Sequence, residues 1–163
     1  MPPAKPEEFV AGEWKRVLDD RFRLTLPVEV APLVMDPEGN SILCKERPGC
    51  LSLWRAQDWQ SRTDAGVNLI RQKITAGRLE QRWDDVQRLG RLLSTRARNV
   101  KLAHRSRLVI PEGFREFLEV PAEGDILLIG AGICLEIWNP KHWLEHLREE
   151  LPAFGTLFKQ LSD

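Results

Sequence analysis

The stretches that decide the fold are LDDRFRLTLP at residues 18–27 and LAHRSRLVIP at residues 102–111. Both contain an arginine–x–arginine–leucine core, and both close on proline. They lie 84 positions apart, and a shift of 84 aligns residues 18–59 with residues 102–143 without a gap. Twelve of these 42 aligned positions are identical, whereas chance at typical amino-acid frequencies gives roughly 2 to 3. The chain therefore contains a tandem duplication.

Each copy predicts the same order of elements. Residues 21–26 alternate between polar and apolar side chains, which predicts a strand with two distinct faces. Side chains two apart on a strand point the same way, so the two arginines of each copy are expected on one face. The closing proline is expected to end this strand and open a short helical turn. Two further strands and then a helix follow in each copy. The strands are predicted at residues 41–46 and 50–54 in the first copy and at residues 125–130 and 134–138 in the second.

A helical insert separates the copies, because Val67, Ile70 and Ile74 recur at helical spacing and a second amphipathic run follows Gly77. Neither copy has enough strands to close a sheet alone, so we expect the copies to pack into one pseudo-two-fold unit. The predicted fold class is α+β, mainly β. Its parts are an N-terminal extension, a first repeat, the helical insert, a second repeat and a C-terminal helix with its tail, at residues 1–12, 13–60, 61–97, 98–145 and 146–163.

The composition restricts the class of protein. The 163 residues include 24 basic and 24 acidic side chains, so any affinity for nucleic acid must come from a local patch. No apolar run approaches the roughly 18–20 residues that cross a bilayer, so we expect no membrane partner. The first ten residues lack the basic and apolar regions of a secretory signal. Three cysteines without metal-ligand spacing fit a reducing, cytoplasmic environment.

Candidate catalytic and metal-binding residues have simpler structural explanations. His142 and His146 are four apart, as two metal ligands on a helix are, but no third ligand accompanies them and a solvated helix face is favoured. Cys50 and Cys134 occupy equivalent positions in apolar strands and are expected to be buried. The recurring tryptophans are expected in the core, although six in one chain also allow base stacking. The sequence predicts no enzyme, cofactor, metal or small-molecule substrate.

The basic residues of the duplicated stretch point to DNA. Residues 96–107 hold five lysine or arginine side chains and no acid. The arginine pair is retained in both copies, and paired guanidinium groups on a β-ribbon suit phosphate oxygens and the O6/N7 edge of guanine. A solvated surface strand is the plainer interpretation of such a cluster. The candidate DNA-binding residues are Arg21, Arg23, Arg105 and Arg107, with Lys101 and His104 supporting them.

At these residues the chain resembles the MraZ family, whose signature is approximately Asp-x-Lys-Gly-Arg-x-x-x-Pro, once per half. Asp19, Arg21, Arg23 and Pro27 match it, with phenylalanine in place of glycine at position 22. In the second half Arg105, Arg107 and Pro111 match, but Ala103 stands in place of the acid and Ser106 in place of the glycine. The stretch RLLSTRARNV is also similar to the helix end that precedes the second family motif.

The resemblance implies a double-split β-barrel made of two SpoVT-AbrB-like half-domains, and assembly into a ring-like homo-oligomer. It implies a cytoplasmic, nucleoid-associated transcriptional regulator that binds short direct repeats in a promoter, often that of the cell-division and cell-wall gene cluster. The alternative is an oligomeric interaction or scaffold protein that keeps the fold but has lost operator recognition. The neutral composition and the replaced glycines favour this alternative.

Overall fold

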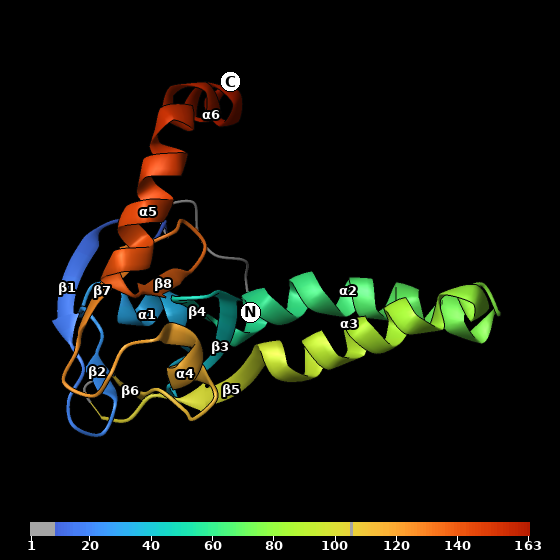
Figure 1. Cartoon of the computed structure of the whole chain (residues 1–163), viewed down its shortest axis with the longest axis horizontal. Helices are drawn as coiled ribbons and strands as arrows, with labels where there is room; N and C mark the ends of the chain where they lie inside the picture. The colour runs from blue at the N-terminus through green and yellow to red at the C-terminus, as the bar shows by residue number, and fades with distance from the viewer. Residues whose placement is uncertain (1–8, 105) are drawn as a thin grey trace.

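A six-stranded antiparallel sheet forms the centre of the molecule (Figure 1). The computed structural model describes residues 9–104 and 106–163. The strands follow the order β1-β7-β8-β4-β3-β5, and a separate two-stranded ladder joins β2 to β6. Their bounds are Glu13–Val17 for β1, Arg23–Thr25 for β2, Asn40–Arg47 for β3, Cys50–Trp54 for β4, Ala97–Lys101 for β5, Arg107–Val109 for β6, Asp125–Gly130 for β7 and Leu135–Trp138 for β8.

The duplication is visible element by element. The bounds of β1 and β5 differ by 84 residues at both ends, and so do those of β2 and β6. The short helix α1 (Ala31–Val34) follows β2, and α4 (Phe114–Leu118) follows β6 in the same place. Each copy therefore contributes four strands and one helical turn in the same order.

The two copies exchange their first strands. β1 of the first copy pairs with β7 of the second, whereas β5 of the second copy pairs with β3 of the first. At the centre, β4 pairs with β8 so that Ser52 faces Glu136, and in the small ladder Leu24 faces Leu108. The members of each pair are equivalent in the two copies, so the pseudo-two-fold axis passes through both pairs. Neither copy completes its part of the sheet without the other.

The main core lies between the six-stranded sheet and a cover formed by β2, β6, α1 and α4. The cover contributes apolar side chains that alternate along short segments, among them Leu24, Leu26, Leu108 and Ile110, each no more than 2 % exposed. A smaller cluster lies on the opposite face of the sheet, where Trp54 packs with Trp59 at a ring-centroid distance of 5.6 Å. The duplicated pair Trp138 and Trp143 repeats this contact at 5.2 Å. The predicted core role is confirmed for Trp54 and Trp138, whereas Trp59 and Trp143 are only partly buried and pack against them from the helices.

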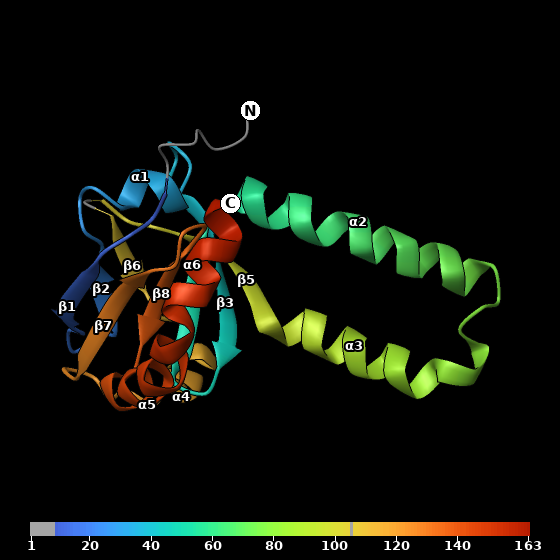
Figure 2. The same ribbon diagram turned by 90° about the horizontal axis from the view of Figure 1, so that it is seen from above.

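Two helical arms extend from this body in different directions (Figures 1 and 2). The first consists of α2 (Ala56–Thr75), a short 3-10 turn η1 (Glu80–Arg82) and α3 (Trp83–Arg96). The second consists of α5 (Pro140–Glu150), η2 (Leu151–Ala153) and α6 (Phe154–Ser162). No residue of these helices is buried. The arms therefore add surface to the molecule without adding to its core.

The α+β class predicted from the sequence is confirmed, and the strands supply its core. The predicted barrel is not seen as a closed ladder: within residues 9–104 and 106–163, β1 and β5 remain edge strands of the six-stranded sheet. The β2–β6 ladder covers the sheet instead of joining it. One reason is length, since β2 and β6 have three residues each and have their hydrogen-bonding groups paired to each other.

Candidate nucleic-acid interface

The first candidate turn is built around the carboxylate of Asp19. Its Oδ1 accepts the backbone amides of Arg21 at 2.9 Å and Arg23 at 2.8 Å, and its Oδ2 accepts the Arg23 guanidinium Nε at 2.6 Å. Partial burial alone raises the pKa of the Asp19 carboxyl, but these hydrogen bonds and the charge of Arg23 bring the pKa below its ordinary value. Asp19 therefore holds the turn as an anion and fixes the Arg23 side chain.

The second turn is closed in a related way without that anion. The Ala103 amide donates to the Arg107 carbonyl at 2.8 Å, as the Asp19 amide donates to the Arg23 carbonyl at 3.1 Å in the first turn. The Ala103 carbonyl accepts from Arg107 at 3.3 Å, whereas the Asp19 carbonyl accepts from Phe22 at 3.2 Å. Alanine offers no acceptor, and within the described residues the Arg107 side chain makes no hydrogen bond or ion pair. Arg107 is half-buried as a residue, and no acid of the described chain holds its guanidinium, unlike that of Arg23.

Phe22 and Ser106 stand where the signature has glycine, and both have a φ of 57°. This is the left-handed region, which glycine enters without steric cost and other residues rarely enter. The Phe22 ring packs against the main core and lies under the Arg115 guanidinium, whose Cζ is 4.4 Å from the ring centroid. Both turns therefore hold these two residues in a conformation that glycine favours.

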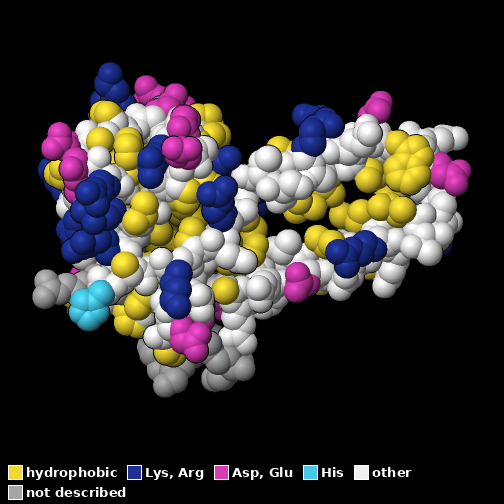
Figure 3. Space-filling model, turned by 90° about the horizontal axis from the view of Figure 1, so that it is seen from below, with side chains coloured by type: hydrophobic (Ala, Val, Ile, Leu, Met, Phe, Trp, Pro, Cys, Tyr) yellow, Lys and Arg dark blue, Asp and Glu magenta, His cyan; other side chains and the backbone are white. Residues whose placement is uncertain are grey.

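The β2–β6 ladder brings the two turns to one end of the molecule. The Leu26 amide donates to the Ser106 carbonyl at 3.1 Å, and the Ile110 amide donates to the Phe22 carbonyl at 2.9 Å. These bonds extend the ladder on both sides of the Leu24–Leu108 pair. Lysine and arginine side chains gather at this end of the surface (Figure 3). The fold thus joins two equivalent cationic turns into one surface.

The predicted site residues differ in their placement. Arg21 is exposed in the first turn, whereas β2 begins only at Arg23. The prediction that Arg21 and Arg23 share one face of a strand is therefore wrong, because the Asp19 carboxylate bends the chain at Arg21. Lys101 is exposed at the end of β5, and His104 is exposed in the second turn. Arg105 lies outside the described residues.

Arg16 is a cation at this end that the sequence did not single out. It lies on β1, and its guanidinium donates to the carbonyl of Thr25 at 3.4 Å and to that of Lys15 at 2.9 Å. Thr25 is in turn the ladder partner of Arg107. Lys15 and Arg16 precede the signature, but only the pairing of β1 with β7 brings them beside the second copy. No pattern within residues 13–17 predicts that pairing.

The other candidate sites have structural roles. Burial raises the pKa of the Cys44 and Cys134 thiols to about 12 and also raises that of the Cys50 thiol, so all three stay protonated. His142 Nε2 lies 2.6 Å from Glu119 Oε2, and the His146 ring stacks on Trp138 at a centroid distance of 5.0 Å. Among residues 9–104 and 106–163, no group of three or more His, Cys, Asp and Glu side chains is placed to hold a metal ion.

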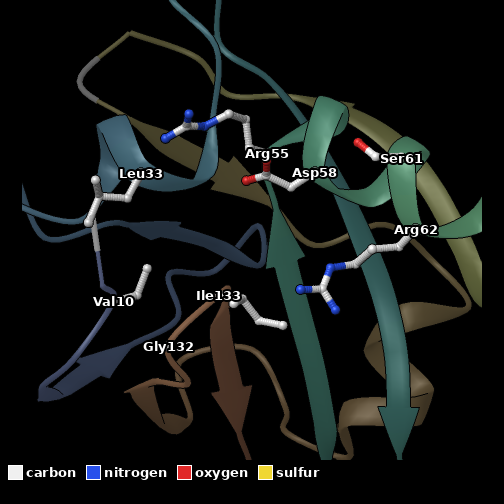
Figure 4. A pocket seen from close by; sticks show the side chains of 8 residues that line it. All are labelled: Val10, Leu33, Arg55, Asp58, Ser61, Arg62, Gly132 and Ile133. Carbon is white, nitrogen blue, oxygen red and sulfur yellow. The ribbon is translucent and has the colours of Figure 1, made fainter. Parts of the chain in front are cut away.

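A cavity of about 220 Å³ lies between α1, the start of α2 and the turn before β8 (Figure 4). Arg55, Asp58 and Arg62 line it together with apolar side chains, and the two guanidinium groups point to different parts of the cavity. The acid of Asp58 balances part of their charge. The lining therefore does not converge on one ligand, and the cavity is separate from the two turns.

Similarity to known proteins covers most of the chain. The profile of a family described as "MraZ protein, putative antitoxin-like" matches residues 93–156. "Transcriptional regulator MraZ" of Treponema denticola is 24% identical over 154 residues, which cover 94% of this chain and 98% of that protein. The protein of the same name from Thermus thermophilus is 26% identical over 140 residues, which cover 86% of this chain and 88% of that protein. The one from Roseiflexus castenholzii is 26% identical over 150 residues, which cover 91% of this chain and 93% of that protein.

The chain is similar to proteins of the MraZ family. The duplication within the chain accounts for the two equivalent turns. The signature acid is present in the first turn as Asp19 and absent from the second, where Ala103 replaces it. Phe22 and Ser106 stand at the glycine positions of the approximate signature, and both have a backbone conformation that glycine favours. No helix in the described ranges combines the length and apolar character needed to span a membrane.

Proposed function

We propose that this chain is a DNA-binding transcriptional regulator without enzymatic activity, acting in the cytoplasm on the nucleoid. The single observation that carries the proposal is the pair of equivalent cationic turns that the β2–β6 ladder joins at one end of the molecule. The MraZ relatives, which are named transcriptional regulators, support the same role. The ligand in this proposal is double-stranded DNA, and neither cofactor nor small-molecule substrate is invoked.

The two turns supply different contacts in this proposal. Arg21 and Arg107 have guanidinium groups without an acidic partner in the described chain, so they are the groups available to phosphate oxygens and guanine edges. Arg23 is held by Asp19 and presents a fixed donor array. Lys101 lies at the end of β5 and adds positive charge on the approach to the second turn, and His104 lies in that turn. In the sequence, Arg105 adds a further cation between His104 and Ser106. The second turn therefore carries the larger share of the electrostatic affinity.

We propose further that several copies act together on direct repeats in a promoter, that of the cell-division and cell-wall gene cluster. One copy offers few phosphate contacts, and linking several copies converts later contacts into intramolecular ones with a high effective concentration. Exposed apolar faces on α3 and α6 support assembly of copies of this chain, because Trp83, Leu92, Phe154 and Phe158 are each between 47% and 64% exposed. A ring-like homo-oligomer is the form we propose.

The second candidate function is an interaction or scaffold protein that assembles but does not recognise an operator. The neutral net charge favours it, as does the ion pair that holds Arg23 to Asp19. This alternative keeps the oligomer and predicts no specific DNA binding, so the two functions are separable by one measurement.

The test is fluorescence anisotropy with duplex DNA from upstream of the chain's own gene, over a salt series. The logarithm of affinity is expected to fall linearly with the logarithm of salt, by about 0.9 for each phosphate neutralised. The double variant R21Q/R107Q is expected to bind at least about tenfold more weakly at 0.1 M salt and to show a shallower slope. It should also discriminate less between the promoter and a scrambled duplex.

The matched control is K141Q/R148Q, which removes the same two charges from exposed positions on α5. This control is expected to bind like the unaltered protein. Undetectable or salt-independent binding by the unaltered protein, with the oligomer intact in light scattering, would sink the regulator proposal in favour of the scaffold function.

A further inference from the structure

A second group of cations lies away from the turns, on the edge of the sheet. Lys45 of β3 and Arg98 of β5 project over the same aromatic ring, that of Phe114 at the start of α4. Lys45 Nζ is 4.8 Å from the ring centroid, and Arg98 Cζ is 5.7 Å from it. The Phe114 side chain is only 3 % exposed, so it is a fixed support for both cations. We call these three residues the Phe114 platform.

The platform concentrates positive charge without a compensating acid. In the described part of the chain, the side chains of Lys45 and Arg98 make no ion pair or hydrogen bond. The acid next in sequence, Glu46, is bound by the Ser52 hydroxyl and by Arg96. Two like charges over one ring repel each other, and an anion placed between them would relieve that repulsion. The platform therefore has the charge and the geometry to accept an anion.

The platform lies on the approach to the second turn. β5 runs from Ala97 to Lys101 and continues directly into the turn at Ala103. A β-strand rises about 3.3 Å per residue, so Arg98 lies roughly 16 Å along the chain from Ala103. This distance is somewhat larger than the width of the DNA major groove, which is roughly 12 Å. The surface in Figure 3 shows lysine and arginine side chains over the region of α4 and β5, in addition to those at the end with the turns. A duplex held at the turns can therefore extend over the platform.

The platform exists in only one of the two copies. The positions equivalent to Lys45, Arg98 and Phe114, found by the shift of 84, are Ile129, Trp14 and Val30. None of these is charged, and the Trp14 indole instead donates to Glu29 at 3.1 Å. The platform thus breaks the pseudo-two-fold symmetry that the turns obey. A DNA site that contacts it must lie in one direction across the molecule.

We propose that the Phe114 platform is a second, sequence-independent binding site for backbone phosphates of the bound DNA, and that it sets the direction in which the duplex crosses the subunit. This inference rests on the proposed function. The aromatic ring restricts both side chains before binding, which lowers the entropy lost when they engage phosphate. A directional contact also suits direct repeats, because every repeat unit then meets a subunit in the same orientation.

Protection of the β5 edge is the structural alternative, since charged side chains on an edge strand discourage pairing with other chains. That role needs the charge but no DNA. It predicts that neutral variants associate through the sheet edge without any change in DNA binding by the non-associated protein. The proposal and this alternative therefore differ in what the salt series measures.

The test compares K45Q/R98Q with the unaltered protein in the anisotropy salt series on the promoter duplex. The expected result is a loss of up to about 1.8 from the slope and a weakening of roughly tenfold or more at 0.1 M salt. Binding to a scrambled duplex should weaken by the same factor, since phosphates carry no sequence information. Shortening the promoter duplex at one end only should weaken binding by the unaltered protein and leave K45Q/R98Q unaffected.

The control K141Q/R148Q is expected to keep both the slope and the sensitivity to duplex length, and thermal melting checks that each variant is folded. A K45Q/R98Q protein that is folded and binds with an unchanged slope overturns the platform proposal, whatever its state of association. If R21Q/R107Q still weakens binding in that case, the proposed function stands. If the unaltered protein binds no DNA, the proposed function itself is lost and the platform proposal falls with it.

Discussion

The backbone at Phe22 and Ser106 shows how single residues retain the shape of the turns. Both residues have the left-handed conformation, which costs a side-chain-bearing residue roughly 1–2 kcal/mol relative to glycine. Phe22 gains packing against the core and the contact with Arg115. Ser106 is half-buried and has no comparable contact in the described chain. The same strain is therefore offset in the first turn and not in the second.

This difference predicts opposite effects of restoring glycine. S106G is expected to raise the free energy of unfolding by about 0.5–1 kcal/mol, because relief of the left-handed strain exceeds the extra chain entropy of glycine when unfolded. F22G is expected to lower it by about 1 kcal/mol, because the lost ring packing and cation–π contact outweigh the same relief. Urea denaturation of both variants measures the two changes. A loss of stability in S106G contradicts this account of the second turn.

The β2–β6 ladder is the element on which both turns depend. It has only three residues in each strand, and its central pair, Leu24 and Leu108, is buried at 2 % and 1 % exposure. The backbone bonds of Phe22 and Ser106 extend this ladder, so the position of each turn follows from the other copy. The ladder therefore links stability of the core to the geometry of the interface.

Truncation at the centre of the ladder tests this link. L108A is expected to lower the free energy of unfolding by about 2–5 kcal/mol, since it leaves a cavity in a well-packed site. V109A, at the adjacent residue that is 45% exposed, is expected to stay within about 0.5 kcal/mol of the unaltered protein. Urea denaturation measures the stability of each variant. DNA anisotropy at a temperature where both variants are folded then measures their binding separately. Equal stability of the two variants would show that the ladder is not a central packing element.

At the scale of the whole molecule, the two arms have apolar faces that no residue of the described ranges covers. α6 exposes Phe154, Leu157, Phe158 and Leu161, each at least 50% exposed, and together with Phe9 they line an apolar groove of about 340 Å³. The facing sides of α2 and α3 carry further apolar side chains (Figure 3). The arms point in different directions, so neither covers the other within one chain (Figures 1 and 2). The α6 face of one copy can pack against the α2–α3 arm of the next copy. This contact then recurs from each copy to the next, and it generates a ring if the rotation that relates successive copies closes.

Charges on the apolar face of α6 are therefore expected to dissociate the proposed oligomer. F158E/L161E should shift the mass measured by light scattering towards that of one chain, 18.8 kDa, with little change in the melting of the body, because these residues lie outside its core. T156E/Q160E adds the same charge to the other side of α6 and is the control that should stay assembled. An F158E/L161E protein with unchanged mass shows that α6 is not an assembly surface.

Much of the local structure could be predicted from the sequence. The duplication located both arginine-bearing turns, and the strand predictions at residues 50–54 and 125–130 coincide with β4 and β7. β3 and β8 were predicted to within one residue at each end. These predictions succeeded because alternation, proline and glycine act within a few residues of the chain. The strands β1 and β5 were not predicted, since residues 13–17 and 97–101 share no identical position and lack regular alternation.

The tertiary structure decided which strands meet. Three features join residues far apart in the chain. They are the exchange of β1 and β5 between the copies, the pairing of Leu24 with Leu108, and the contact of Lys45 and Arg98 with one aromatic ring. The bend at Arg21 also depended on it, because the Asp19 carboxylate outweighs the local alternation that favours a strand. Local patterns in the sequence therefore predicted the repeat, most of its strands and the cations of the two turns. Long-range pairing, which no local pattern encodes, brings those turns and Arg16 to one end of the molecule.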